Sequence, residues 1–204
     1  MEIMFDRSLL IAFAFGVSAC SQSAPASKAG GAKADCATRA FAEIGGPISL
    51  IDHTGQSVTE ADFKGQPSLI YFGFTYCPDI CPAALVTIDR ALKRLPEGVA
   101  APRTILISID PERDTPEAMQ AYITTDVFPD NIVGLTGSVE AVTEAAASFA
   151  SGFTRIDDPE SLAEYTMDHT SIIYLMDEDW ALKTFFTHEA TAETIGDCLA
   201  THLG

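Results

Sequence analysis

The sequence predicts one α/β domain, a sheet with helices on its faces. Short apolar runs typical of buried strands alternate with segments whose apolar residues recur at helical spacing. Near each end of the domain, two apolar runs flank turn residues and indicate a β-hairpin. About 165 residues remain after the N-terminal segments are set aside, which is enough for one substantial core.

The first half of the domain has a strand–helix order. Residues 47–59 predict a hairpin that turns at Thr54-Gly55-Gln56, and residues 68–75 predict a buried strand. The helix that follows is marked by apolar residues at helical spacing, Leu85, Ile88, Leu92 and Leu95.

Two more strand–helix pairs follow. A buried strand is predicted over residues 104–109 and a short strand over 131–136. Thr115 is a typical N-cap because Pro116 takes the first helical position, and a helix should run from there to about Tyr122. The next helix is marked by Val139, Val142 and Phe149.

The C-terminal part predicts a hairpin plus a helix. Residues 171–176 and 181–187 should form its strands around the turn at 177–180. A last helix should begin near Thr191. The sheet should therefore gain antiparallel strands at its end.

Two cysteines lie where the strand over 68–75 meets the following helix. Chemistry in open parallel sheets sits at this carboxyl end of the strands. Asp79 is interpreted as the helix N-cap, which places Cys81 in the first turn, and Pro82 suits that turn because it lacks an N–H. The helix start lowers thiol pKa values, so Cys77 and Cys81 can form a disulfide, hold a soft metal, or do both.

The string FGFTYCPDICP, residues 72–82, resembles the signature of the SCO/SenC family, copper proteins that assist cytochrome c oxidase assembly. Three further segments resemble later blocks of that family in the same order: SIDPERDTPE (108–117), GLTG (134–137) and YTMDHTSIIYL (165–175). Tyr76 departs from the family at a position where His is common, and Trp180 at one that is often Gly.

The resemblance implies a thioredoxin-like fold and a copper site formed by Cys77, Cys81 and His169. Two thiolates and an imidazole suit three-coordinate Cu(I) and tolerate Cu(II) with one more ligand. Asp110 is a candidate to orient His169 or a partner from behind the ligands; equally, it opens the Asp-Pro turn before Glu112. The remaining histidines are expected to be solvated, His53, His188 and His202.

The N-terminus predicts export. Residues 1–19 resemble a lipoprotein-type signal peptide, with Cys20 as the lipidated residue. Residues 20–38 read as a lipid-anchored flexible tether, and 39–204 as the domain. The expected location is the bacterial periplasm. The alternative is an ordinary cleaved signal with an incidental Cys20.

Cys36 and Cys198 remain of the five cysteines. Because an oxidising compartment disfavours free thiols, they could bridge the start of the domain to its last helix. The alternative is two unpaired thiols. Cys77 and Cys81 are expected to form a redox-active pair.

The net charge of −17 disfavours nucleic acid and anionic membrane as partners. It suits cations or basic partners, and it also suits a surface adapted for solubility.

The leading functional prediction is a copper-binding protein, a copper chaperone that acts on the copper-bearing subunit of cytochrome c oxidase or another periplasmic copper protein. The alternatives are a thiol–disulfide oxidoreductase using Cys77 and Cys81, and a peroxidase-like relative. Residues 168–171 contain no proline at the place where thioredoxin-type reductases carry one, which favours metal binding.

Overall fold

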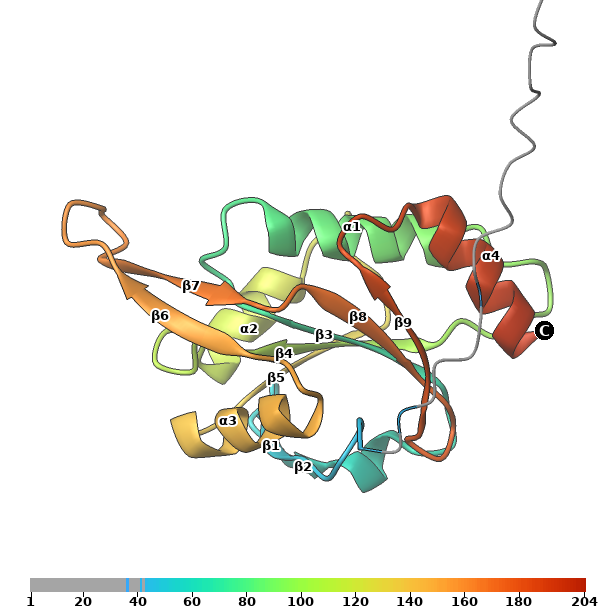
Figure 1. The fold of residues 1–204 in the computed structure, drawn as a ribbon, viewed down its shortest axis with the longest axis horizontal. Coiled ribbons are helices and arrows are strands. Elements are labelled where there is room, and N and C mark those ends of the chain that lie inside the picture. The colour runs from blue at the N-terminus through green and yellow to red at the C-terminus, as the bar shows by residue number, and fades with distance from the viewer. Residues whose placement is uncertain (1–35, 37–40, 42) are drawn as a thin grey trace, which may run out of the picture. The chain divides into compact units, whose positions relative to one another are not determined.

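The computed structural model describes residues 36, 41 and 43–204 (Figure 1). The strands are β1 (Ser49–Asp52), β2 (Ser57–Thr59), β3 (Ser68–Gly73), β4 (Arg103–Ser108), β5 (Ile132–Thr136), β6 (Phe153–Asp157), β7 (Tyr165–His169), β8 (Ile172–Met176) and β9 (Leu182–Thr187). The helices are α1 (Ile80–Leu92), α2 (Pro116–Ile123), α3 (Val139–Ser148) and α4 (Ala192–Leu203), with a short 3-10 helix, η1, at Glu60–Phe63. The predicted signal peptide, Cys20 and the tether apart from Cys36 lie outside the described residues.

The predicted α/β class is confirmed by a seven-stranded mixed sheet of order β2-β1-β5-β4-β3-β8-β9. Strands β3, β4 and β5 are parallel and form its centre. All six residues of β3 are buried, as expected for a strand that is covered on both faces. The predicted N-terminal and C-terminal hairpins add antiparallel strands at the two edges.

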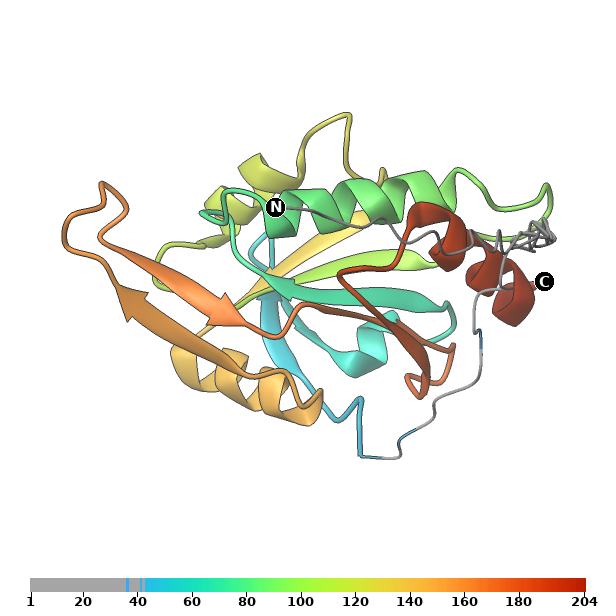
Figure 2. The same cartoon turned by 45° about the horizontal axis from the view of Figure 1, so that its top comes forward.

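The helices cover both faces of the sheet. Helices α1, α2 and α4 lie on one face and α3 lies on the other (Figures 1 and 2). The residues that predicted α1 do face the core, since Leu85 and Ile88 are fully buried. The predicted N-caps Thr115 and Thr191 accept hydrogen bonds from the N–H groups of Ala118 and Thr194.

Among the residues that the structure describes, none of the helices has the length and apolar character needed to cross a bilayer.

Strands β6 and β7 form a hairpin that the sequence analysis missed. They pair antiparallel as a separate two-stranded sheet and project beyond the edge of the main sheet (Figures 1 and 2). Four of the five residues of β6 are exposed, so the strand lacks the alternation of apolar and polar residues that marks a half-buried strand. The short helix η1 was also missed.

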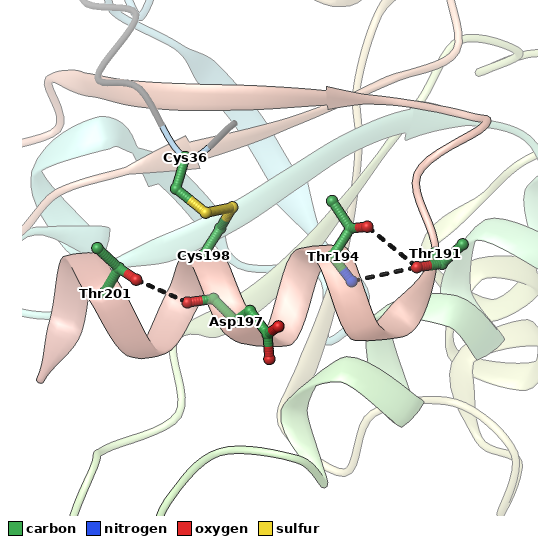
Figure 3. Close-up of a disulfide and its surroundings, with 6 residues drawn as sticks. All are labelled: Cys36, Thr191, Thr194, Asp197, Cys198 and Thr201. Atoms are coloured by element: carbon green, nitrogen blue, oxygen red, sulfur yellow. Dashed lines mark hydrogen bonds between the residues drawn. A yellow bond between two sulfur atoms is a disulfide. The ribbon is translucent and has the colours of Figure 1, made fainter. Parts of the chain in front are cut away.

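Cys36 and Cys198 are joined by a disulfide with an S–S distance of 2.01 Å (Figure 3). Cys198 lies on the buried side of α4, a helix capped by Thr191 through the Thr194 N–H at 3.1 Å. The bond therefore ties residue 36 to the last helix of the domain.

Loss of this disulfide should destabilise the domain. Because the two cysteines are 162 residues apart, the bond restricts most of the unfolded chain. The chain-entropy model places the effect at up to roughly 5 kcal/mol. We expect Cys36→Ser with Cys198→Ser to lower the free energy of unfolding, measured by denaturant titration. Cys77→Ser with Cys81→Ser in metal-free protein is the matched control. Equal stability of the two double variants would contradict the expectation.

Candidate metal centre

The loop between β3 and α1 holds the two cysteines at the carboxyl edge of the parallel strands. The Cys77 N–H donates to the Phe74 carbonyl at 3.2 Å, which closes the turn before the helix. Cys81 lies in the first turn of α1 and is fully buried, whereas Cys77 is half-buried. Both are free thiols. Because of this difference in burial, the Cys81 sulfur lies in the core and the Cys77 sulfur lies near the surface.

The sulfur of Cys77, rather than the carboxylate of Asp79, caps this helix. Asp79 occupies the predicted N-cap position, but its side chain makes no capping hydrogen bond. The Cys81 N–H donates to Cys77 Sγ at 3.3 Å instead. An N–H group at a helix start carries partial positive charge and favours a thiolate acceptor.

His169 ends β7 and faces the buried cysteine. Its Nε2 lies 3.7 Å from Cys81 Sγ. Its Nδ1 lies 3.1 Å from the Thr170 carbonyl oxygen. Because a carbonyl oxygen only accepts, Nδ1 must carry the hydrogen, and in the neutral ring Nε2 then presents its lone pair toward the cysteines. This is the tautomer that a metal ligand needs.

Aromatic rings and a glycine shape the space around these atoms. The imidazole of His169 meets the rings of Tyr71 and Phe74 edge-on, each with centroids 6.1 Å apart. The Tyr71 hydroxyl lies 3.9 Å from Cys81 Sγ. A Cβ on Gly73 would lie 3.0 Å from Cys81 Sγ. A side chain at position 73 would therefore press on the buried sulfur.

The two thiols differ in acidity. A hydrogen bond from the Cys81 thiol lowers the pKa of Cys77 to about 4; burial opposes this shift, and hydrogen bonds from the backbone N–H groups of Cys81 and Asp79 add to it. The hydrogen bond to Cys77 and, after it, burial raise the pKa of Cys81 well above its ordinary value. At neutral pH the pair therefore holds one proton, on Cys81, and one negative charge, on Cys77.

The three donors are neighbours rather than a closed triad. Within the described part of the chain, no three His, Cys, Asp or Glu side chains are already arranged as a metal site. The donor set nevertheless matches a soft ion, because it combines a thiolate, a thiol that can be deprotonated and an imidazole with a free lone pair.

Asp110 does not contact His169 through any of its hydrogen bonds. Its carboxylate accepts from the Tyr165 hydroxyl at 2.7 Å and from Arg113 Nε. Arg113 also donates to the carbonyls of Ala163 and Tyr165. Of the two readings of Asp110, the turn agrees with the structure, because the Asp110 carbonyl accepts from the N–H groups of Arg113 and Asp114. The His169 ring is held by the Thr170 carbonyl, and Asp110 holds the start of the strand that carries the ring.

Asp114 was missed by the sequence analysis and anchors the cysteine loop. It is fully buried and accepts from the Thr75 N–H at 3.1 Å, from the Thr75 hydroxyl at 2.6 Å and from the Ser108 hydroxyl at 2.6 Å. Burial raises its pKa. The available signal was a carboxylate directly before the predicted N-cap Thr115, in the loop between a buried strand and a helix.

The other histidines do not join the site. His188 is exposed as predicted. His53 and His202 are partly exposed. His53 Nδ1 accepts from the Gly134 N–H at 3.2 Å, so this side chain links the loop after β1 to β5.

Comparison with known proteins assigns the chain to a family. The SCO1/SenC family profile matches residues 37–204. The chain belongs to the SCO1/SenC family. The mitochondrial SCO1 homologue of Homo sapiens is 38% identical over 162 residues, which cover 78% of this chain and 53% of that protein. The chain therefore spans about half the length of the curated relatives it matches first.

Solved structures of Sco proteins share the fold. Arabidopsis thaliana ScoI with copper bound has a TM-score of 0.72 at 33% identity, over 78% of this chain and 96% of that chain. BsSco, described as a member of the Sco family of cytochrome c oxidase assembly proteins with a disulfide switch, has a TM-score of 0.59 at 26% identity, over 80% and 96%. These likenesses confirm the predicted thioredoxin-like fold and the predicted family.

The acidity of Cys77 gives a testable pH profile. Its pKa of about 4 lies below that of an ordinary thiol, so the thiolate is present above that pH and is lost as the pH falls through it. We expect iodoacetamide to alkylate Cys77 in reduced, metal-free protein at a nearly constant rate between about pH 6 and 8. Mass spectrometry at each pH follows the reaction. In the Cys77→Ser control, Cys81 should stay unreactive. A rate that climbs tenfold per pH unit would contradict the assignment.

Proposed function

We propose that this chain is a copper-binding protein, tethered to the membrane in the bacterial periplasm, that assists assembly of the copper A centre of cytochrome c oxidase. The observation that carries the proposal is the approach of His169 Nε2 to the buried sulfur of Cys81, with Cys77 beside it. In this proposal, copper is the cargo that the protein carries.

The site chemistry supports copper as that cargo. Cys77 supplies a thiolate, His169 supplies the Nε2 lone pair, and Cys81 supplies a second thiolate once its proton leaves. Two sulfur ligands favour Cu(I), and the imidazole lets the site accept Cu(II). Copper binding should therefore release a proton and weaken at low pH.

The partner is proposed from the family and from charge. A Sco protein of known structure carries copper, and another is described as an oxidase assembly protein. The net charge of −17 favours encounter with a basic surface. The proposed recipient is the copper-bearing subunit of the oxidase, with another periplasmic copper protein as the alternative.

Thiol–disulfide exchange would use the same two sulfurs. The position of His169 favours metal binding over it, because a reductase has no need of an imidazole lone pair directed at its buried cysteine. We therefore do not propose reductase activity as the main function.

Copper stoichiometry tests the proposal. Reduced wild type should bind one Cu(I), and Cys77→Ser or Cys81→Ser should abolish tight binding because a single thiolate remains. His169→Ala should weaken Cu(I) binding and affect Cu(II) more, since the site loses its imidazole. Anaerobic titration with a competing Cu(I) chelator measures each case. Oxidation of the cysteine pair should release the metal.

His188→Ala is the matched control, because His188 is an exposed histidine outside the site. It should bind copper as wild type does. Equal copper retention by wild type and the three site variants would place the metal elsewhere and sink the proposal.

The tether is the second part of the proposal. Residues 1–19 would be removed as a signal peptide, Cys20 would carry lipid, and residues 20–38 would link it to the domain at 39–204. Stable anchoring takes two acyl chains, because one chain binds a membrane only marginally.

Fractionation tests the tether. Cys20→Ser should move the protein from the membrane to the soluble fraction, because no acyl chain can then be attached. Ser21→Ala is the control and should leave the protein on the membrane. An intact mass of the mature protein that shows Cys20 unmodified would refute lipidation.

A further inference from the structure

A cavity of about 430 Å³ lies next to the candidate metal centre. Hairpin β6–β7, the loop after β4 and the first residue of α3 line it. Its apolar lining includes Ile109, Val139, Phe153 and Met167. Phe153 is the cross-strand partner of His169. A group bound in the cavity against Phe153 would therefore lie beside the residue that carries the imidazole.

Carboxylates dominate the polar rim of the cavity. Arg155 donates to Glu112 at 3.0 Å and to Asp157 at 2.8 Å, and its guanidinium lies 3.6 Å from the centre of the Tyr165 ring. Two carboxylates thus surround the one cation. Over residues 153–169 the hairpin carries five acidic residues and one basic residue. At the rim itself, Glu112 and Asp157 outnumber Arg155, so the rim carries an excess of negative charge.

We propose that this cavity docks a bulky apolar side chain carried on a positively charged segment of the protein that exchanges copper with the site. The inference rests on the proposed function and deepens it by naming the contact surface. An apolar cavity of this size accommodates one large side chain, which is the usual anchor of an interface. The acidic rim selects a cationic segment around that anchor.

The chemistry argues against a second copy of this chain as the occupant. Two molecules with a net charge of −17 repel each other, and the hairpin would bring like charges together. A cationic partner would instead be attracted to the acidic rim. Docking there would bring its copper ligands to the edge of the sheet where Cys77 and His169 lie.

Two synthetic probes test the proposal on the mature chain, in both metal-free and Cu(I)-loaded forms. Each is a fluorescein-labelled lysine-rich peptide, with Trp at its centre in one and Ala in the other. Fluorescence anisotropy should show the Trp peptide binding roughly tenfold or more tightly, because a large side chain leaves water. Both peptides should bind more weakly as salt rises.

A pair of matched variants locates the binding. Val139→Arg places a long cation at the cavity, and Val139 is exposed enough, at 49%, to accept it. Val127→Arg makes the same change at a valine that is 54% exposed and does not line the cavity. The Trp preference should vanish in Val139→Arg and persist in Val127→Arg.

Copper titration of the same variants separates this inference from the proposed function. Both variants should bind Cu(I) as wild type does, because neither residue is a ligand.

Loss of the Trp preference only in Val139→Arg supports the docking cavity. No binding of the Trp peptide, equal affinity for the two peptides, or equal behaviour of the two variants would overturn it. Self-association that Val139→Arg abolishes would also overturn it, in favour of a second copy. Failure of copper binding in wild type would overturn the proposed function and leave the peptide result standing.

Discussion

The parallel pairing of β3 with β4 is the constraint on which the rest of the site depends. Its register sets Gly73 opposite Ser108, so the loops after both strands leave the sheet at the same edge. Asp114 can then accept hydrogen bonds from both Thr75 and Ser108. A buried carboxylate with three donors couples the cysteine loop to the neighbouring loop. The apolar strands thus fix the position of a polar site.

The third donor reaches the site by a different route. His169 is 88 residues from Cys81 and arrives on a hairpin that projects from the main sheet (Figure 2). The start of that strand is held by Asp110, Arg113 and Tyr165, a charged network rather than a layer of apolar side chains. Burial and the bond to Asp110 raise the pKa of Tyr165 to about 12, so the phenol keeps the proton it donates. Placement of the imidazole is therefore set by hydrogen bonds, which are directional.

The cysteine pair shows how one local geometry produces two different thiols. Helix α1 begins directly after the loop, so its first free N–H groups point at Cys77. The same helix carries Cys81 into the core, against Tyr71 and Gly73. One sulfur is thereby stabilised as an anion and the other as a thiol, although both belong to one short motif. Sequence spacing predicts that they meet, but their division of charge follows from the hydrogen bond between them, from the backbone N–H groups at Cys77 and from the burial of Cys81.

The sequence by itself determined the features that depend on neighbouring residues. Helical spacing in α1, the cap at Thr115 and the buried runs of β3 and β4 follow from local patterns. The four motif blocks indicated Cys77, Cys81 and His169 together. Hairpin β6–β7, the role of Asp110 and the anchor at Asp114 were decided only by the tertiary structure. The roles of Asp110 and Asp114 depend on contacts with residues far away in the chain. Strand β6 is mostly exposed, and an exposed strand leaves no periodic pattern in the sequence.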